Sequence, residues 1–155
     1  MNNNNNPAIR NSLSASGGEG QGEVAANSQS MHWDVIYTYT RAQAVADGFQ
    51  IEVTKTAAEA GICFPVFITR GVYERCVAVP PGVTGQDEAG RLWDVVWMLR
   101  FAIIRSQPGN SRLSFALYVR NDNRRPRLMK LLATAGAVDI DDPAPAITVM
   151  LPDDD

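Results

Sequence analysis

The segment QDEAGRLWDVVWMLRFAIIR, residues 86–105, decides the fold because it is the longest helix-patterned stretch of the chain. One apolar stripe at helical spacing consists of Leu92, Val96, Leu99 and Ile103. A second stripe consists of Trp93, Trp97 and Ile104. Acidic residues in the first turn and arginines near the end suit the helix dipole. The segment therefore predicts a helix that is apolar around most of its circumference and forms the centre of the core.

The remaining narrow edge of this helix carries three charged side chains. Asp87 and Arg91 are four residues apart, and Arg91 and Asp94 are three residues apart. These spacings bring side chains together on one helical face. Asp87, Arg91 and Asp94 are therefore predicted to form structural ion pairs.

The chain after this helix predicts three antiparallel strands. Residues 113–120 and 147–151 alternate between apolar and polar side chains, which is typical of half-buried strands. Residues 128–134, LMKLLAT, have helix propensity but lie between two turn-rich stretches, so we interpret them as the middle strand. The three strands form a meander against which the long helix can pack.

The chain before the long helix predicts shorter elements. Strands are expected at 33–39, 49–54 and 64–68, the last at a sheet edge because Pro65 has no backbone N–H to donate. Short helices are expected between and after these strands, each beginning at a threonine cap. The predicted caps are Thr40, Thr56 and Thr69, with Glu59 completing a capping box with Thr56.

These elements predict one α+β domain over residues 31–152. A small antiparallel sheet, including the C-terminal three-stranded meander, packs on the long helix, with two or three short helices. Residues 1–30 are rich in Asn, Ser and Gly and predict a disordered tail. Met31 is a candidate alternative start after this tail, and residues 153–155 form an acidic end.

Composition limits both the size and the location of the protein. A chain of 155 residues with 45% hydrophobic and 20% charged side chains suits one globular domain with a packed core. The N-terminal residues lack the apolar region of a secretory signal, and the longest apolar stretch is shorter than the ~18–20 residues that span a bilayer. We therefore expect a cytoplasmic protein without a membrane segment, with Cys63 and Cys76 as buried free thiols.

Few residues in the chain suit catalysis. The single histidine, His32, lies beside the predicted tail, which removes the usual general base from the domain. The two cysteines have no zinc-type spacing, and no glycine-rich phosphate loop is present in the sequence. We therefore expect a protein that is not an enzyme and that uses neither a cofactor nor a metal ion.

The candidate partner-binding residues are charged and fall in three groups. Four arginines surround one predicted hairpin turn: Arg120, Arg124, Arg125 and Arg127. A second group on the predicted helix before the long one consists of Arg70, Glu74 and Arg75. The third is the acidic end, Asp153, Asp154 and Asp155. Guanidinium clusters suit phosphate or carboxylate recognition, and acidic ends either solvate the chain or meet a basic partner.

Several strings resemble a family of small bacterial proteins that is classed only as a domain of unknown function. They are YTYTRAQAVADGFQIEVT, FPVFITRGVYERCV, QDEAGRLWDVVWM and ITVMLPDDD, and the likeness covers residues 35–153. Members of that family are frequent on plasmids, integrative elements and phages, and no catalytic residues are known to carry over. The turn RNDNRRPR, residues 120–127, departs from the family pattern.

Three hypotheses follow from these features. The first is a non-enzymatic mobile-element protein that binds another protein, with a host defence component such as a restriction or CRISPR effector as the candidate partner. The second is a nucleic-acid-binding regulator that uses the turn from Arg120 to Arg127, with the acidic end as a competitor. The third, and least supported, is an enzyme that uses Asp94 or Glu74 without histidine.

Overall fold

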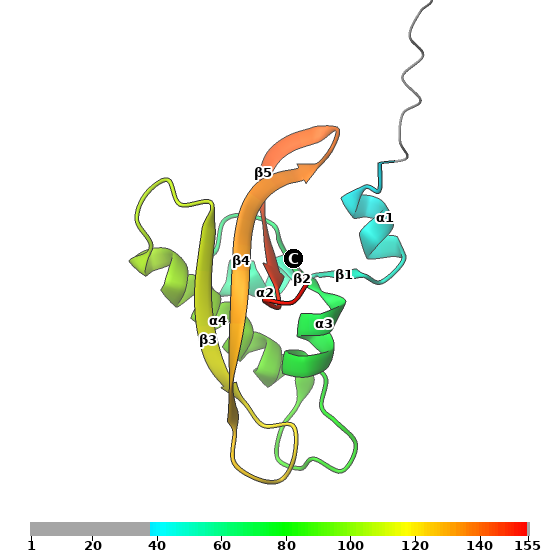
Figure 1. Ribbon diagram of the computed structural model, residues 1–155, viewed down its shortest axis with the longest axis vertical. Coiled ribbons are helices and arrows are strands. Elements are labelled where there is room, and N and C mark those ends of the chain that lie inside the picture. Colours follow the sequence, from blue (N-terminus) through cyan, green and yellow to red (C-terminus); the bar gives the residue numbers. More distant parts are fainter. Residues whose placement is uncertain (1–37, 155) are drawn as a thin grey trace, which may run out of the picture. The chain divides into compact units, whose positions relative to one another are not determined.

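A five-stranded mixed sheet organises residues 38–154, the part of the chain that the computed structural model describes (Figure 1). The strands are β1 (Gln50–Glu52), β2 (Val66–Thr69), β3 (Arg112–Val119), β4 (Arg127–Asp139) and β5 (Asp142–Met150). The helices are α1 (Arg41–Ala46), α2 (Thr54–Glu59), α3 (Arg70–Val72), the π-helical turn η1 (Tyr73–Val77) and α4 (Glu88–Arg105). The predicted α+β class is confirmed.

The C-terminal meander forms as predicted. Strands β3, β4 and β5 pair antiparallel in chain order, with Phe115 opposite Leu131 and Ala133 opposite Val149. The ambiguous residues 128–134 lie within β4, so their interpretation as a strand is confirmed. The apolar members of these runs share one face of the sheet because side chains alternate along a strand.

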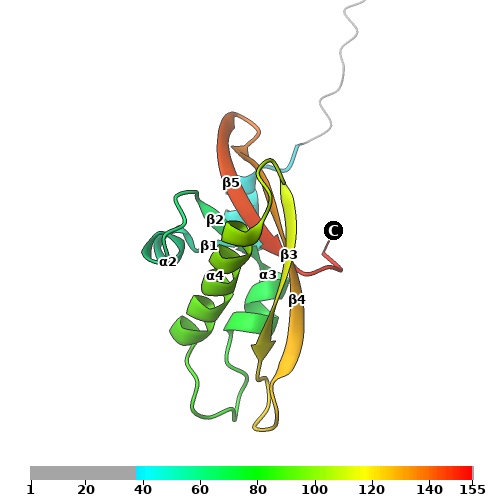
Figure 2. The same cartoon turned by 90° about the vertical axis from the view of Figure 1, so that its left-hand side faces the viewer.

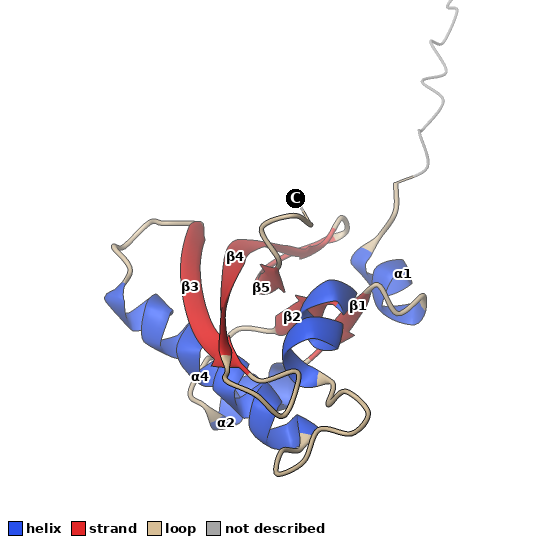
Figure 3. Cartoon of the chain, turned by 60° about the horizontal axis from the view of Figure 1, so that its bottom comes forward, coloured by secondary structure: helices blue, strands red, loops and turns tan. Residues whose placement is uncertain are grey.

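The core lies between this face of the sheet and α4, which Figure 2 shows running along it. The strands contribute Val66, Ile68, Leu131 and Val149, and α4 contributes Val95, Val96 and Leu99, each fully buried. Figure 3 shows α4 and the shorter helices in blue beside the red strands. The predicted packing of the long helix on the meander is therefore confirmed.

Strand β2 corrects one expectation about the sheet. It lies inside the sheet, antiparallel to β1 and parallel to β5, rather than at an edge. Pro65 precedes the strand, so its lack of a backbone N–H removes no hydrogen bond from within β2. Its carbonyl accepts the N–H of Ile147 (2.8 Å). The parallel pair also makes the sheet mixed, whereas the sequence predicted an antiparallel one.

The short helices match the predicted caps unevenly. Thr40 and Gln43 form a capping box for α1, and Thr69 caps α3 as expected. The predicted box at Thr56 and Glu59 is wrong, because α2 already begins at Thr54. The Thr54 hydroxyl instead accepts the N–H of Val66 (3.2 Å), which ties the start of α2 to β2.

The predicted helix over residues 70–77 changes type along its length. Its first turn is α3, and η1 continues it with wider π-type turns. Because η1 ends at Val77, the carbonyls of Arg75 and Cys76 lie in its last turn and accept hydrogen bonds from a side chain of α4. That side chain is Arg91.

Arg91 is a buried anchor rather than a member of an ion pair. It is 5% exposed, and its Nε donates to the Cys76 carbonyl (3.0 Å). Its Nη2 donates to Asn121 Oδ1 (2.6 Å) and, more weakly, to the Arg75 carbonyl (3.4 Å). Arg91 therefore joins α4, η1 and the loop after β3.

The predicted ion pairs of Asp87, Arg91 and Asp94 are consequently wrong. Asp87 is the N-cap of α4 and accepts the N–H of Gly90 (2.8 Å), while Asp94 is exposed. Arg91 points inward, where its guanidinium donates to the carbonyls of Cys76 and Arg75 and to Asn121 Oδ1 instead of to a carboxylate. The predicted strand at 33–39 lies almost wholly outside the described residues, as do the predicted tail, Met31, His32 and Asp155.

Replacing the buried anchor should weaken the fold. Arg91→Met keeps the apolar stem but leaves the Cys76 carbonyl and Asn121 Oδ1 without a donor, while the Arg75 carbonyl keeps its bond from Asn121 Nδ2 (2.8 Å), so the free energy of unfolding should fall by about 3 kcal/mol. Urea unfolding followed by circular dichroism measures this loss. Arg124→Met, at an exposed position, is the control and should change stability by less than about 0.5 kcal/mol. Equal stability of the two variants would contradict the anchoring role.

Candidate protein-binding surface

A row of large side chains lies on the solvent side of α4. Trp93, Trp97 and Ile104 are 37%, 47% and 64% exposed. The two indole rings stack with centroids 5.8 Å apart, and the Arg100 guanidinium lies 5.4 Å from the Trp97 ring. We call Trp93, Trp97, Arg100 and Ile104 the tryptophan face.

The helix is apolar around most of its circumference as predicted, but this face shows that α4 lies at the side of the core rather than at its centre. In the described range, the sheet, η1 and α2 cover the side of α4 that contains Arg91, Val95, Val96 and Leu99. The second apolar stripe remains in contact with solvent. Spacing alone could not separate the two stripes, because a stripe that is covered by the sheet and one that stays exposed have the same period.

An apolar cleft adjoins the C-terminal end of α4. Its volume is about 210 Å³, and Phe64, Leu99 and Ile103 line it together with parts of β4 and β5. Phe64 is itself half exposed. A cleft of this size beside exposed aromatic rings suits one apolar anchor side chain of a partner.

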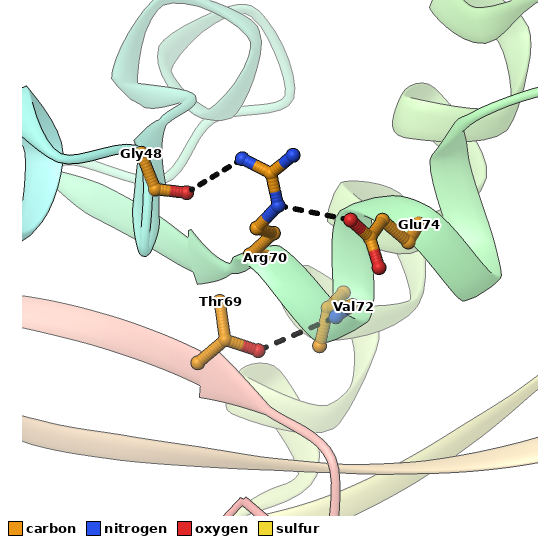
Figure 4. A network of polar contacts seen from close by, with 5 residues as sticks. All are labelled: Gly48, Thr69, Arg70, Val72 and Glu74. Carbon is orange, nitrogen blue, oxygen red and sulfur yellow. Dashed lines mark hydrogen bonds and ion pairs between the residues drawn. The ribbon is translucent and has the colours of Figure 1, made fainter.

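The predicted group Arg70, Glu74 and Arg75 divides into two parts. Arg70 and Glu74 form an exposed i,i+4 ion pair (2.9 Å), and Arg70 also donates to the Gly48 carbonyl (3.4 Å; Figure 4). Such an exposed pair contributes little to stability and satisfies both charges within the chain. Arg75 lies apart from this pair and lines a different pocket.

Arg75 joins two arginines of the β3–β4 turn. Arg75, Arg125 and Arg127 line a pocket of about 440 Å³, which we call the arginine pocket. Asp122 is the carboxylate of this pocket, and it lies 3.7 Å from Arg127. Three guanidinium groups around one carboxylate leave a net positive pocket.

The other two predicted arginines have different surroundings. Arg120 donates to the Thr84 carbonyl (2.6 Å) and so holds the loop before α4 against the end of β3. The Arg124 backbone N–H bonds to Asp122 Oδ1 (2.9 Å), and its side chain is not among the residues that line the pocket. The sequence therefore located the turn correctly but could not indicate that Arg75 would join it.

The acidic residues near the C-terminus are partly used within the chain. Asp154 Oδ2 accepts the Thr69 hydroxyl (2.7 Å) and the Leu151 N–H (3.1 Å). Asp139 accepts the N–H groups of Arg41 and Ala42, each at 3.0 Å, and the bond from Ala42 is the main cause of its lowered pKa. Asp153 is exposed. Asp139 thus ties the end of β4 to the start of α1, and Asp154 ties the C-terminal residues to the end of β2.

The described residues offer limited sites for other ligands. Within residues 38–154, no group of three His, Cys, Asp or Glu side chains is arranged to hold a metal ion. None of the helices in that range has both the length and the apolar character needed to span a bilayer. Comparison with protein-family models, with curated proteins and with solved structures gave no match. The assignment of a function therefore depends on the surfaces described above.

The two cysteines differ in exposure, which corrects the expectation that both are buried. Cys63 is exposed, whereas Cys76 is buried in η1, and burial raises the pKa of the Cys76 thiol to about 11. At pH 8 the folded protein should react with a thiol reagent at Cys63 and leave Cys76 unmodified, because the thiolate is the reactive form. Peptide mapping after alkylation measures this, with urea-unfolded protein as the control. Modification of Cys76 at the rate of Cys63 in the folded protein would contradict it.

Proposed function

We propose that the protein is a non-enzymatic accessory protein of mobile elements that acts by binding another protein through the tryptophan face. The observation that carries this proposal is the stacked, exposed pair Trp93 and Trp97 with Arg100 beside it. Tryptophan and arginine are the residue types most enriched among those that dominate binding energy at protein interfaces.

The physical argument rests on the cost of exposing aromatic rings. Burying apolar surface releases roughly 25 cal/mol per Å², so rings left in contact with water forgo that stabilisation until a partner covers them. Contiguous apolar patches are uncommon on proteins that do not use them for binding. The apolar cleft at the C-terminal end of α4, lined by Phe64 and Ile103, adds a place for an anchor side chain.

The resemblance to mobile-element proteins supports a host defence component as the partner. An inhibitor of a restriction or CRISPR effector needs only to occupy a functional surface, and a standard interface takes about 800 Å² from each partner. A domain of this size can supply that area without catalytic groups. The proposed role is therefore stoichiometric inhibition.

A pair of substitutions tests the role of the tryptophan face. Trp93→Ala/Trp97→Ala should reduce capture of the host partner by the tagged full chain at least about tenfold, because truncating such residues typically costs 2 kcal/mol or more. Mass spectrometry of captured host proteins measures this. Ile140→Ala is the control, since Ile140 is more exposed than either tryptophan (61%) but lies away from α4 at the turn between β4 and β5.

The inhibitor role is tested separately, by the identity and the activity of the captured partner. The captured partner should include a restriction or CRISPR component, and the purified protein should suppress the activity of that component. Undiminished capture by the double variant would contradict the assigned surface. A partner set with no defence component would contradict the anti-defence role and leave the surface supported.

A second candidate function is nucleic-acid binding, which the arginine pocket favours because Arg75 joins Arg125 and Arg127 there. Guanidinium groups bind phosphate oxygens in a bidentate manner. The hypothesis that the acidic end competes with nucleic acid for these arginines has less support. Residues 142–150 form β5, and Asp154 is bonded to Thr69.

Replacing the pocket arginines tests this candidate. Arg75→Ala/Arg125→Ala should weaken binding of single-stranded DNA about tenfold or more at low salt and reduce the slope of log affinity against log salt by about 1–2. Fluorescence anisotropy at several salt concentrations measures both. Arg70→Ala removes an exposed arginine outside the pocket and is the control. No measurable binding by the unaltered chain would exclude the candidate.

A further inference from the structure

Strand β3 forms one edge of the sheet, and its backbone presents open hydrogen-bonding groups. Ala135 donates its N–H to the Ser111 carbonyl (2.7 Å), and the register places Leu113 opposite Ala133. Hydrogen-bonded pairs alternate along an antiparallel ladder, so the odd-numbered residues of β3 bond to β4. The N–H and C=O groups of Ser114, Ala116 and Tyr118 therefore face away from β4.

This edge lacks the features that prevent pairing with another strand. Apart from Arg112 at its start, β3 contains no charge, it contains no proline, and its register with β4 runs without a bulge. Edge strands of soluble proteins are commonly protected by such features. Within residues 38–154, no further strand lies beside β3 on its open side. The rest of this edge is therefore open to pairing with another strand.

The side of α4 nearest to β3 carries its own complementary pattern. A groove of about 530 Å³ between α4 and β3 is lined by Met98, Phe101 and Arg105 from the helix. Asp94 lies one turn before Met98 on the same side and lines a small pocket together with Leu117 and Tyr118 of β3. This stripe has an acidic residue at one end, a basic residue at the other and apolar residues between them. We call Asp94, Met98, Phe101 and Arg105 the side stripe.

We propose that two copies of the chain pair through β3 across a two-fold axis at Phe115, which extends the sheet from five strands to ten. In that register, Ser114 bonds to Ala116 of the second copy, and Arg112 lies opposite Tyr118 of the second copy. Both pairs join residues whose backbone faces the open edge. The two Phe115 rings then meet on the α4 side, where aromatic cross-strand pairs are favourable.

The side stripe is self-complementary about the same axis. Two α4 helices that run antiparallel side by side place Asp94 opposite Arg105 of the second copy, and Met98 opposite Phe101 of the second copy. The midpoint of the stripe falls between Met98 and Phe101, and these residues share the groove with Phe115. A two-fold interface requires this kind of self-complementary patch.

Charge favours a second copy over an unrelated strand. Pairing about Phe115 puts each Asp94 opposite Arg105 of the second copy, so the charges at the ends of the two side stripes meet as opposite-charge pairs. An unrelated extended segment would complete the ladder but would leave the side stripe uncovered. The tryptophan face occupies the next stripe around α4, so it remains exposed in the dimer. This inference therefore stands independently of the proposed function.

Blocking the open edge provides the first test. Sedimentation equilibrium of the full chain should give twice the chain mass of 16.9 kDa. Ser114→Pro should give the single-chain mass, because the lost N–H faces the open edge and proline is tolerated there. Ser114→Thr, which keeps the N–H, should remain dimeric. A single-chain mass for the unaltered protein up to its solubility limit, or a dimer that survives Ser114→Pro, would overturn the proposal.

Reversing charges on the side stripe provides the second test. Asp94→Arg should raise the dimer dissociation constant about tenfold, because it places like charges together twice at the interface. The double variant Asp94→Arg/Arg105→Asp should restore dissociation to within about threefold of the original, since the swapped charges again meet opposite partners. Failure of the double variant to recover, with circular dichroism unchanged, would overturn the antiparallel pairing of α4.

Discussion

The rotational setting of α4 on the sheet is the constraint on which the rest of the structure depends. Arg91 fixes this setting by donating from inside the core to the carbonyl of Cys76 and to the side chain of Asn121. With Arg91 turned inward, Val95 and Leu99 face the sheet on the same side. The geometry of a helix then turns Trp93 and Trp97 outward and Asp94 toward β3.

Two neighbouring stripes of one helix thus have different surroundings and different proposed roles. The tryptophan face carries the exposed aromatic rings of α4 and suits a partner protein. The side stripe borders the edge strand β3 and suits a second copy of the chain. A dimer built in this way would present two tryptophan faces on the same side of a continuous sheet. The arginine pocket lies at the β3–β4 turn, away from both stripes along the chain.

Local patterns in the sequence predicted much of the fold, and their failures have physical reasons. Alternation in 113–120 and the turn signals around 128–134 identified β3 and β4, because strand periodicity depends only on neighbouring residues. The interior position of β2 could not be predicted, because Pro65 stands just before the strand rather than within it. Arg91 was expected in an ion pair because helical spacing shows proximity along the surface but not which side chains point inward.

The candidate surface was harder to predict for a related reason. The stripe of Trp93, Trp97 and Ile104 was read from the sequence, but its exposure depends on how many layers cover α4. Arg75 was placed in the wrong group, because its approach to Arg125 is a contact between distant segments. In each case, the residues were identified by their local pattern while their surroundings were set by tertiary packing.

The most direct test of the claim that the tryptophan face binds a protein is site-specific photocrosslinking. A photoreactive phenylalanine analogue replaces Trp97 in one full-length chain and Ile140 in another, and both are irradiated in the host cell. The expected result is one covalent adduct with a host protein from position 97 and none from position 140. Adducts that are equal at both positions, or that contain only the chain itself from position 97, would contradict the claim.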